Sequence, residues 1–381
     1  MKKSICFVIP TIRYGGTELF LLRLSDLISR NYHVSIVVIG KREGLYSRFE
    51  ACDLKIFYIG VERKILFFKA VLSLRRFLKN ENPDILYSFL YMADILVVFS
   101  TVFLKIEKII WSLRGTKLAH GTSLHKLIIQ RISIRFSRFV PDLIVACSDQ
   151  AREFHIKLGS PAKKIIVIYN FLPKWINETV SKSVLATNQY PKSFVIGMAA
   201  RFEKGKGHIL LAESIVAFLD INPDIKIKLN YAGKNCGPNQ ELSELLMRDN
   251  LIAQKLTENR LELIFTGLLE QDDLQLWFRD IDLYIMASTS LEAFPNSLAE
   301  AIAIGIPAVA NSIGAASEFL PKSRINFDLS IEGMVSTLMG IYHEDLATRN
   351  INTNLAKTNV KRISDTNNII QQFESAFRLN P

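Results

Sequence analysis

Residues 283–301 read LYIMASTSLEAFPNSLAEA: four apolar residues, a loop of small and polar residues, and then a stretch with helical spacing. The apolar run predicts a buried strand, and Pro295 fits the first turn of the helix that follows. A strand, a short loop and a helix in this order form the repeating unit of parallel sheets covered by helices. The stretch therefore predicts an α/β fold.

The same alternation continues outward in both directions and predicts two sets of strands. The first set is Ile5–Ile9, Val34–Ile39, Lys55–Ile59, Ile85–Phe89, Lys108–Leu113, Leu143–Cys147 and Ile165–Ile168. The second set is Phe194–Ala199, Ile225–Ala232, Leu261–Phe265, Leu283–Met286 and Ala308–Ala310. Residues 171–193, which contain two prolines, interrupt the rhythm and are predicted to be a linker.

We therefore expect two Rossmann-like domains, residues 1–170 and 194–364, in agreement with the length of 381 residues. Beyond Thr353 the chain is polar until an apolar periodicity returns at Ile369–Phe377. A C-terminal helix at about 365–381 is expected to pack back on the first domain.

The composition, 49% hydrophobic and 22% charged, excludes a disordered chain. The four cysteines, Cys6, Cys52, Cys147 and Cys236, form no C-x-x-C pair, which indicates buried free thiols in a reducing, cytoplasmic compartment. The first apolar run stops after five residues at Pro10, so we interpret it as a strand and not as a signal peptide.

Residues Ile85–Leu104 carry a single charge, Asp94, and are long enough to span a bilayer. A charge at the centre of such a span would cost about 2.5–3.5 kcal/mol on insertion scales. Because Asn82-Pro83-Asp84 also predicts a turn before a strand, we expect a strand followed by a buried helix.

The net charge of +10 is uneven, at +14 for residues 1–180 and −4 for residues 181–381. Much of the excess lies in two amphipathic stretches, Arg63–Lys79 and Ser123–Arg138. In the second, one helical face holds Arg131, Arg135 and Arg138, and another holds Leu124, Leu127, Ile128 and Ile132. Such helices bind anionic membrane surfaces; the alternative is that each packs one face on a sheet. The charge accompanies no nucleic-acid recognition module, so no nucleic-acid partner is predicted.

Two loops have groups that suit an anionic ligand. In RYGGTE, residues 13–18, Gly15 and Gly16 would let a ligand approach backbone amides at a helix start, although a tight turn capped by Thr17 explains them equally well. This is not the G-x-G-x-x-G dinucleotide fingerprint. In MAARFEKGKGH, residues 198–208, the Arg201 fork and the Lys206 point charge suit a diphosphate, and a solvated basic loop is the alternative.

The helix after Pro295 is a third candidate, because the amides of Asn296, Ser297 and Leu298 would face an anion with the helix dipole adding attraction. Glu300, one turn further on, could accept hydrogen bonds from a diol. Glu262 and Glu270 have the same spacing as Glu292 and Glu300, so spacing alone marks no site. The loop and helix context of the second pair distinguishes it.

Together these motifs resemble those of the family 4 retaining glycosyltransferases, which have the GT-B fold. The stretch EAFPNSLAEA from Glu292 to Ala301, with AIGIPAV at 303–309, resembles the family signature. Arg201 and Lys206-Gly207 resemble its phosphate-binding pair, Gly15-Gly16 with Glu18 its N-terminal glycine loop, and Tyr169-Asn170 the Asn-Gly before its hinge. The four motifs occur in the family's order across nearly the whole chain.

The resemblance implies an N-terminal acceptor domain, a C-terminal donor domain that binds a nucleotide sugar, and a cleft between them. Arg201 and Lys206 would neutralise the donor pyrophosphate and stabilise the leaving nucleoside diphosphate, and Glu292 would contact the donor sugar; these three are the implied catalytic residues. Glu300 would bind the ribose hydroxyls. The other implied donor-site residues are Gly15, Gly16, Phe294, Asn296 and Ser297; Glu18, Arg114 and Asn170 are assigned to the cleft.

The resemblance also implies a reaction without a metal or other cofactor, in which a donor phosphate oxygen takes the acceptor proton and the anomeric configuration is retained. Two departures stand out. Pro295 lacks the amide hydrogen that members with glycine there have. Many members have a histidine where this chain reads Trp111-Ser112-Leu113-Arg114-Gly115, and we expect Arg114 to face the cleft, with a structural role as the alternative.

The predicted activity is transfer of a sugar, from a UDP-sugar in preference to a GDP-sugar, to a growing and lipid-linked glycan of a surface polysaccharide, lipopolysaccharide or capsule. The enzyme would act on the cytoplasmic face of an anionic membrane as a peripheral protein. The alternatives on this fold are a nucleotide-sugar epimerase, a glycogen-type synthase or a non-catalytic scaffold, the last of which would be expected to lose the charged donor-site residues.

Overall fold

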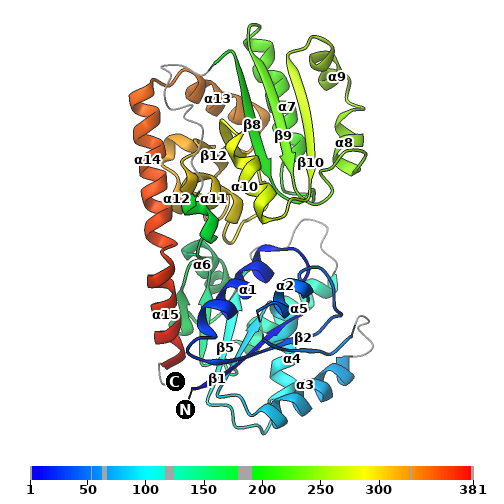
Figure 1. Ribbon diagram of the computed structural model, residues 1–381, viewed down its shortest axis with the longest axis vertical. Coiled ribbons are helices and arrows are strands. Elements are labelled where there is room, and N and C mark those ends of the chain that lie inside the picture. The colour runs from blue at the N-terminus through cyan, green and yellow to red at the C-terminus, as the bar shows by residue number, and fades with distance from the viewer. Residues whose placement is uncertain are drawn as a thin grey trace. The chain divides into compact units, whose positions relative to one another are not determined.

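The structure is a computed structural model and describes residues 2–52, 54–61, 67–115, 124–178, 191–326 and 328–378. The chain forms two compact units (Figure 1), Met1–Phe171 together with Thr366–Pro381, and Leu172–Asp365. Parts of four predicted segments lie outside the described residues: 179–190 of the linker, 379–381 of the C-terminal helix, and 63–66 and 123 of the amphipathic stretches.

The first unit contains a seven-stranded sheet in the order β3-β2-β1-β4-β5-β6-β7, and all neighbouring strands pair in parallel. The strands are β1 (Ser4–Ile9), β2 (His33–Val38), β3 (Lys55–Tyr58), β4 (Ile85–Phe89), β5 (Lys108–Leu113), β6 (Leu143–Ala146) and β7 (Ile165–Val167). The helices are α1 (Gly16–Ile28), α2 (Tyr46–Glu50), α3 (Phe67–Glu81), α4 (Tyr91–Ser100), α5 (Leu124–Phe136), α6 (Asp149–Lys157), the short η2 (Ala162–Lys164) and α15 (Thr366–Arg378).

Helices cover both faces of this sheet. Side chains alternate along a strand, so Phe7 of β1 packs into the cluster that contains residues of α1 and α15, whereas Val8 packs into the cluster that contains residues of α3 and α4. Two-sided burial explains why the strands are continuous apolar runs. The C-terminal α15 inserts Phe373 and Phe377 beside Tyr87, so the end of the chain completes the core of the first unit.

The apolar segment 85–104 forms a strand and a buried helix, β4 and α4, as predicted. Asp94 is fully buried, and its two carboxylate oxygens accept hydrogen bonds from Ser88 Oγ at 2.5 Å and Ser133 Oγ at 3.1 Å. Burial raises the pKa of Asp94 to about 7. In the described part of the chain, no helix has the length and apolar character needed to cross a membrane.

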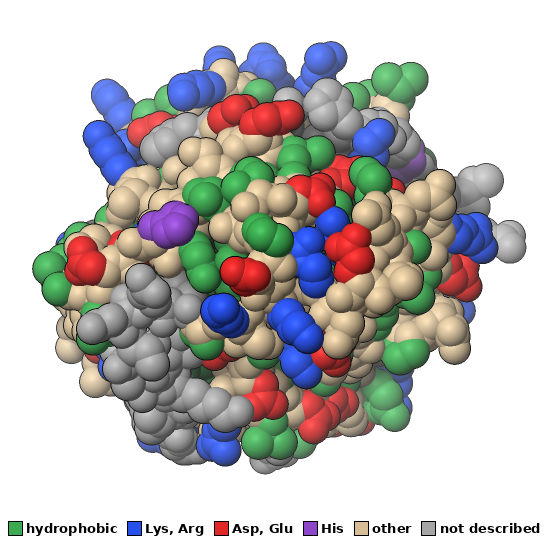
Figure 2. All heavy atoms as spheres, turned by 90° about the horizontal axis from the view of Figure 1, so that it is seen from above, with side chains coloured by type: hydrophobic (Ala, Val, Ile, Leu, Met, Phe, Trp, Pro, Cys, Tyr) green, Lys and Arg blue, Asp and Glu red, His purple; other side chains and the backbone are tan. Residues whose placement is uncertain are grey.

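The second unit contains a six-stranded parallel sheet in the order β10-β9-β8-β11-β12-β13. The strands are β8 (Ser193–Ala199), β9 (Lys226–Ala232), β10 (Leu261–Gly267), β11 (Leu283–Met286), β12 (Ala308–Asn311) and β13 (Ile325–Asn326). The helices are η3 (Lys174–Glu178), α7 (His208–Ile221), α8 (Glu241–Leu246), α9 (Asn250–Thr257), α10 (Gln271–Arg279), α11 (Asn296–Ile304), α12 (Ala316–Phe319), η5 (Lys322–Arg324), α13 (Ile331–Tyr342) and α14 (Leu346–Ile363). The face shown in Figure 2 intermixes acidic, basic and apolar side chains.

Most local predictions are confirmed, and all predicted strands occur to within two residues. The four thiols are free, and all but Cys52 are buried. Two helix starts differ. Gly15 and not Thr17 is the N-cap of α1, and Pro295 is the N-cap of α11 instead of its first helical residue. The short β13 was not predicted.

Candidate functional site

Two of the predicted loops meet at the edge of the second sheet where its strand order reverses. The loop that contains Arg201 and Lys206 follows β8, and the loop that contains Glu292 follows β11. Because β8 and β11 pair in parallel, both loops leave the sheet at the same edge. Ligands of open α/β sheets bind at this place, outside the carboxyl ends of the strands.

Lys206 and Glu292 form an ion pair there. The Lys206 Nζ lies 2.6 Å from Glu292 Oε1, which also accepts a hydrogen bond from Ser288 Oγ at 2.9 Å. The side chains are 24% and 18% exposed, so the pair is accessible from solvent. The structure thus brings together two predicted catalytic side chains, but each is bound to the other rather than positioned independently.

Glycines hold these loops close together. Gly205 and Gly207 have φ values of +93° and +82°, and a Cβ at Gly207 would overlap the carbonyl oxygen of Ala287. The Gly205 carbonyl accepts hydrogen bonds from the amides of Thr289 and Ser290 at 2.8 and 3.0 Å. Only glycine combines these φ values with such close backbone contact. The Lys-Gly in the motif therefore has a packing reason as well as a charge.

The Glu292 loop is also held in place by residues that no sequence motif identified. The buried Asn311 donates hydrogen bonds from Nδ2 to the carbonyls of Ala287 and Ser288, at 3.0 and 3.2 Å. Gly314 has a φ of +74°, and a Cβ there would overlap the Glu292 carbonyl oxygen. A lone asparagine and a lone glycine carry no spacing signal, so sequence reasoning could not have selected them.

Arg201 is half exposed, and its Nη1 lies 3.1 Å from Glu203 Oε1 on the same loop. Exposed pairs of this kind contribute little to stability, so the guanidinium can exchange this partner for another anion. This geometry is compatible with the predicted phosphate contact.

At the start of α11, the backbone amides and the Ser297 side chain have different roles. The first hydrogen bond of the helix runs from the Ala299 amide to the Pro295 carbonyl, so the amides of Asn296, Ser297 and Leu298 lie in the first turn. The Ser297 hydroxyl, however, donates to Ala199 O at 2.8 Å and accepts from Tyr284 OH at 2.7 Å. The side chain of Ser297 therefore ties the helix to the end of β8, and only its backbone suits a ligand.

Two other predicted residues of this segment, Phe294 and Glu300, are buried. The Phe294 ring packs edge-to-face on Phe319, with ring centroids 5.1 Å apart. A donor contact by Phe294 would therefore come from its backbone. Glu300 is 7% exposed, on α11 one turn after Asn296, as the sequence spacing indicated.

The glycine loop of the first unit begins α1. The carboxylate of Glu18 lies directly over Gly15, where a Cβ would overlap Glu18 Oε2, and Thr11 Oγ1 donates to Glu18 Oε1 at 3.4 Å. Gly16 is the first residue of the helix. Gly15 thus meets Glu18 within one turn, in the loop and helix that follow β1.

Arg114 directly follows β5 and contacts three residues of the first unit. Its guanidinium lies 3.4 Å from the centre of the Phe20 ring, Nε donates to Ser112 Oγ at 2.9 Å, and Nη1 donates to Asn170 Oδ1. Burial lowers the pKa of Arg114. The predicted residues Arg114 and Asn170 therefore meet within the first unit.

The sequence contains one Asp-x-Asp triplet, the pattern of a metal-binding motif, at Asp280-Ile281-Asp282. Asp282 Oδ2 accepts a hydrogen bond from the Val195 amide at 2.8 Å, immediately before β11 begins. This is the amino edge of the sheet, opposite the edge that holds Lys206 and Glu292. The triplet therefore ties neighbouring strands together at a place remote from the candidate site.

The first unit also exposes an apolar helix face. On α5 the side chains of Leu124, Leu127, Ile128 and Ile132 are between 37% and 78% exposed, whereas Gln130, Ser133 and Ile134 are buried. The alternative, that this stretch packs its apolar face on the sheet, therefore does not hold for α5. It holds for α3, which buries Ala70, Leu74, Phe77 and Leu78.

Residues 14–173 match the family model described as Glycosyltransferase Family 4, and residues 193–330 match that of Glycosyl transferases group 1, which together span most of the chain. The chain belongs to the family 4 glycosyltransferases. This glycosyltransferase is 29% identical over 148 residues to the lipopolysaccharide core biosynthesis mannosyltransferase LpsB of Rhizobium meliloti (strain 1021), covering 38% of each chain. It is 28% identical over 148 residues to protein CapJ of Staphylococcus aureus, covering 37% of this chain and 34% of CapJ. The chain thus spans little more than a third of the length of these relatives.

Solved structures resemble the glycosyltransferase over its whole length. The complex of Anabaena HepE with UDP and glucose has a TM-score of 0.78 at 19% identity, covering 99% of this chain and 100% of HepE. The lipopolysaccharide outer core galactosyltransferase WaaB, in its apo form, has a TM-score of 0.71 at 14% identity, covering 98% of both chains. With its two parallel sheets, the glycosyltransferase has the predicted GT-B fold.

Proposed function

We propose that this glycosyltransferase moves a sugar, with retention of configuration, from a UDP-sugar to a growing lipid-linked glycan of a surface polysaccharide, lipopolysaccharide or capsule. The observation that carries the proposal is the meeting of Lys206 and Glu292, on the loop pair that also holds Arg201, at the switch point of the second sheet. The UDP complexes of HepE and the lipopolysaccharide role of LpsB support the donor and the pathway class.

The charges present suit departure of a nucleoside diphosphate. As the bond between the anomeric carbon and the donor phosphate oxygen breaks, negative charge accumulates on the diphosphate, and the Arg201 and Lys206 cations stabilise it. The acceptor oxygen bonds to the anomeric carbon from the same side, and its proton passes to a donor phosphate oxygen. Glu292 Oε1 is held by Lys206 and Ser288, which orients Oε2 to accept a hydrogen bond from the donor sugar. Glu300 binds the ribose, and the proposed reaction uses no metal or other cofactor.

The donor is tested by thermal unfolding in the presence of UDP, GDP, ADP and their sugar conjugates. We expect UDP and UDP-sugars to raise the midpoint most, because a ligand that binds only the folded state stabilises it. If no nucleotide stabilises the protein, the proposed donor site is wrong. Repeating the transfer assay with a chelator tests the metal-independent reaction.

Product analysis separates transfer from the alternatives. A transferase consumes the UDP-sugar in step with acceptor, whereas an epimerase converts it without one, and a glycogen-type synthase extends a glucan. A scaffold would bind without turnover. The presence of Arg201, Lys206, Glu292 and Glu300 favours a catalytic protein over a scaffold.

We further propose that α5 attaches the enzyme to the cytoplasmic face of an anionic membrane. The helix exposes its apolar face, as described, and carries exposed Lys126, Arg131 and Arg135 but no acidic residue. Buried apolar area and electrostatic attraction act together in interfacial helices, and each basic residue near an anionic surface contributes about 1 kcal/mol.

A further inference from the structure

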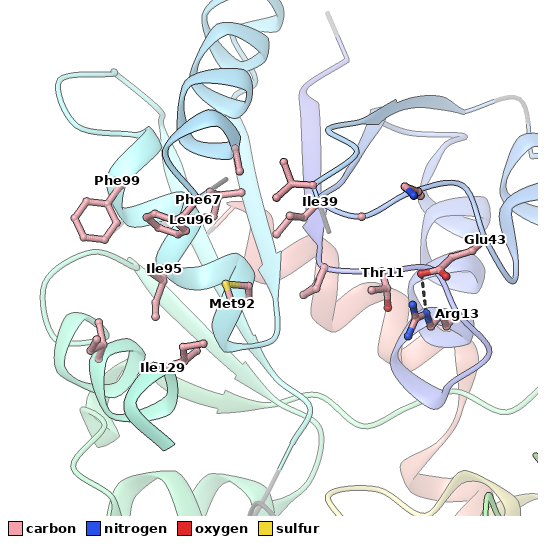
Figure 3. A pocket seen from close by; sticks show the side chains of 16 residues that line it. Thr11, Arg13, Ile39, Glu43, Phe67, Met92, Ile95, Leu96, Phe99 and Ile129 are labelled. Carbon is pink, nitrogen blue, oxygen red and sulfur yellow. Dashed lines mark hydrogen bonds and ion pairs between the residues drawn. The ribbon is translucent and has the colours of Figure 1, made fainter. Parts of the chain in front are cut away.

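The first unit contains a large apolar pocket, which is separate from the loops that hold Lys206 and Glu292 in the second unit. Its volume is about 590 Å³, within the usual range for ligand pockets. Figure 3 shows side chains of α4 and α5, among them Ile95, Phe99 and Ile129, at one end and Thr11, Arg13 and Glu43 at the other. The pocket is therefore polar at one end only.

The polar end lies where ligands of parallel sheets bind. Thr11 and Arg13 follow β1, and Lys41 and Glu43 follow β2, so these residues are at the carboxyl edge of the sheet. Arg13 Nε lies 2.7 Å from Glu43 Oε1, and Lys41 also lines the pocket. Thr11 also contacts Glu18, which connects the pocket to the glycine loop at the start of α1.

The apolar end is continuous with the exposed surface of the helices. Phe99 and Ile132 line the pocket and are also 45% and 37% exposed. Ile132 belongs to the exposed apolar face of α5 that we propose lies on the membrane. A chain that leaves a membrane at α5 would meet the pocket without crossing polar protein surface.

We propose that this pocket binds the hydrocarbon chain of the acceptor lipid, with the lipid phosphate at the Arg13 and Lys41 end; the inference rests on the proposed function. The apolar wall of the pocket offers no hydrogen-bonding side chain for a sugar or a nucleotide. It is formed by Phe67, Met92, Ile95, Leu96, Phe99 and Ile129. Arg13 and Lys41 are the cationic side chains that would contact the phosphate. The glycan attached to that phosphate then extends along the carboxyl edge, towards the glycine loop.

Alkyl phosphates of four to ten carbons, titrated calorimetrically below their micelle concentration, test the inference. We expect affinity to rise about fourfold for each added methylene, the equivalent of about 0.8 kcal/mol. Inorganic phosphate should give no measurable heat. An affinity independent of chain length would overturn the proposal.

Variants that fill the pocket locate the binding. Ile129→Trp and Met92→Trp should each weaken binding of decyl phosphate at least tenfold and raise KM for a decyl-linked acceptor while kcat persists. Leu158→Trp, at a half-exposed apolar residue outside the pocket, is the matched control and should bind normally. Two replacements keep the test valid if one variant fails to fold. Normal binding by a folded pocket variant would contradict the proposal.

Stabilisation by UDP, measured on the same preparations, separates the two proposals. If the wild-type protein binds no alkyl phosphate but is stabilised by UDP, the pocket proposal alone is rejected. Absence of UDP stabilisation from the wild-type protein rejects the proposed function.

Discussion

Lys206 and Glu292 lie 86 residues apart in the chain, yet their Nζ and Oε1 atoms are 2.6 Å apart. Each follows a strand of the pair β8 and β11, so the sheet itself brings them together. Both are partly exposed, and ion pairs near the surface contribute only about 0–1 kcal/mol to stability. Glycines and Asn311 nevertheless hold the two loops in this arrangement, as the proposed role in donor binding requires.

The Lys206→Ala substitution should separate turnover from folding. We expect kcat/KM to fall by roughly 100- to 1000-fold, because the leaving diphosphate loses a cation. The unfolding midpoint should shift by less than about 4 °C, since the lost pair is partly exposed. Steady-state kinetics and thermal unfolding measure the two effects. Lys204→Ala, exposed on the same loop, is the matched control, and an equal rate for both variants would contradict the role of Lys206.

Gly207→Ala should be far more damaging than its size suggests. The new Cβ would overlap the Ala287 carbonyl at a φ of +82°, so the loop has to move away from the Glu292 loop. We expect lower stability together with loss of donor binding, measured by urea unfolding and UDP titration. Gly340→Ala is the control: its Cβ meets no atom within 4 Å, and it lies in helix α13. That variant should be more stable by up to about 1 kcal/mol.

The sequence predicted the strands well for a physical reason. Strands buried on both faces are short apolar runs between polar loops, and this pattern is visible without the structure. The same reasoning fails for β13, which has only two residues. It also fails for α14, whose sequence is too polar to show a helical pattern of apolar residues. The buried residues of this helix are Arg349, Thr353, Ala356 and Val360.

The candidate site was predictable in its parts but not in its contacts. The motifs gave Lys206 and Glu292, whereas their pairing depends on which strands are neighbours, and the strand order is not readable from one sequence. Nor did the sequence predict that the Ser297 hydroxyl would bind Ala199 and Tyr284. The hydrogen bonds from Arg114 to Ser112 and Asn170 were also not predictable from the sequence.

Asp94 should make stability depend on pH. Its folded pKa of about 7 lies above the ordinary value of 3.8, because burial disfavours the charged form. Between these values the folded protein keeps a proton that the unfolded chain has released, so the free energy of unfolding falls as pH rises, by up to about 4 kcal/mol. Asp94→Asn removes this titration. As the pH rises from 5 to 8, the variant should therefore gain stability relative to wild type, as measured by urea unfolding. The contributions of other titrating groups cancel in this comparison. A difference in unfolding free energy that stays constant with pH would reject the raised pKa of Asp94.

Charge reversal on α5 tests the membrane surface apart from catalysis. Arg131→Glu with Arg135→Glu should lower sedimentation with anionic vesicles at low salt by at least tenfold, since each basic residue contributes about 1 kcal/mol and its reversal adds repulsion. Binding by wild type should weaken as salt is added, because exposed charges are screened. Lys361→Glu with Arg362→Glu makes the same change in net charge on exposed residues of α14 and is the matched control. Equal losses for the two double variants would mean that net charge alone governs binding, and the exposed apolar face of α5 would then need another partner.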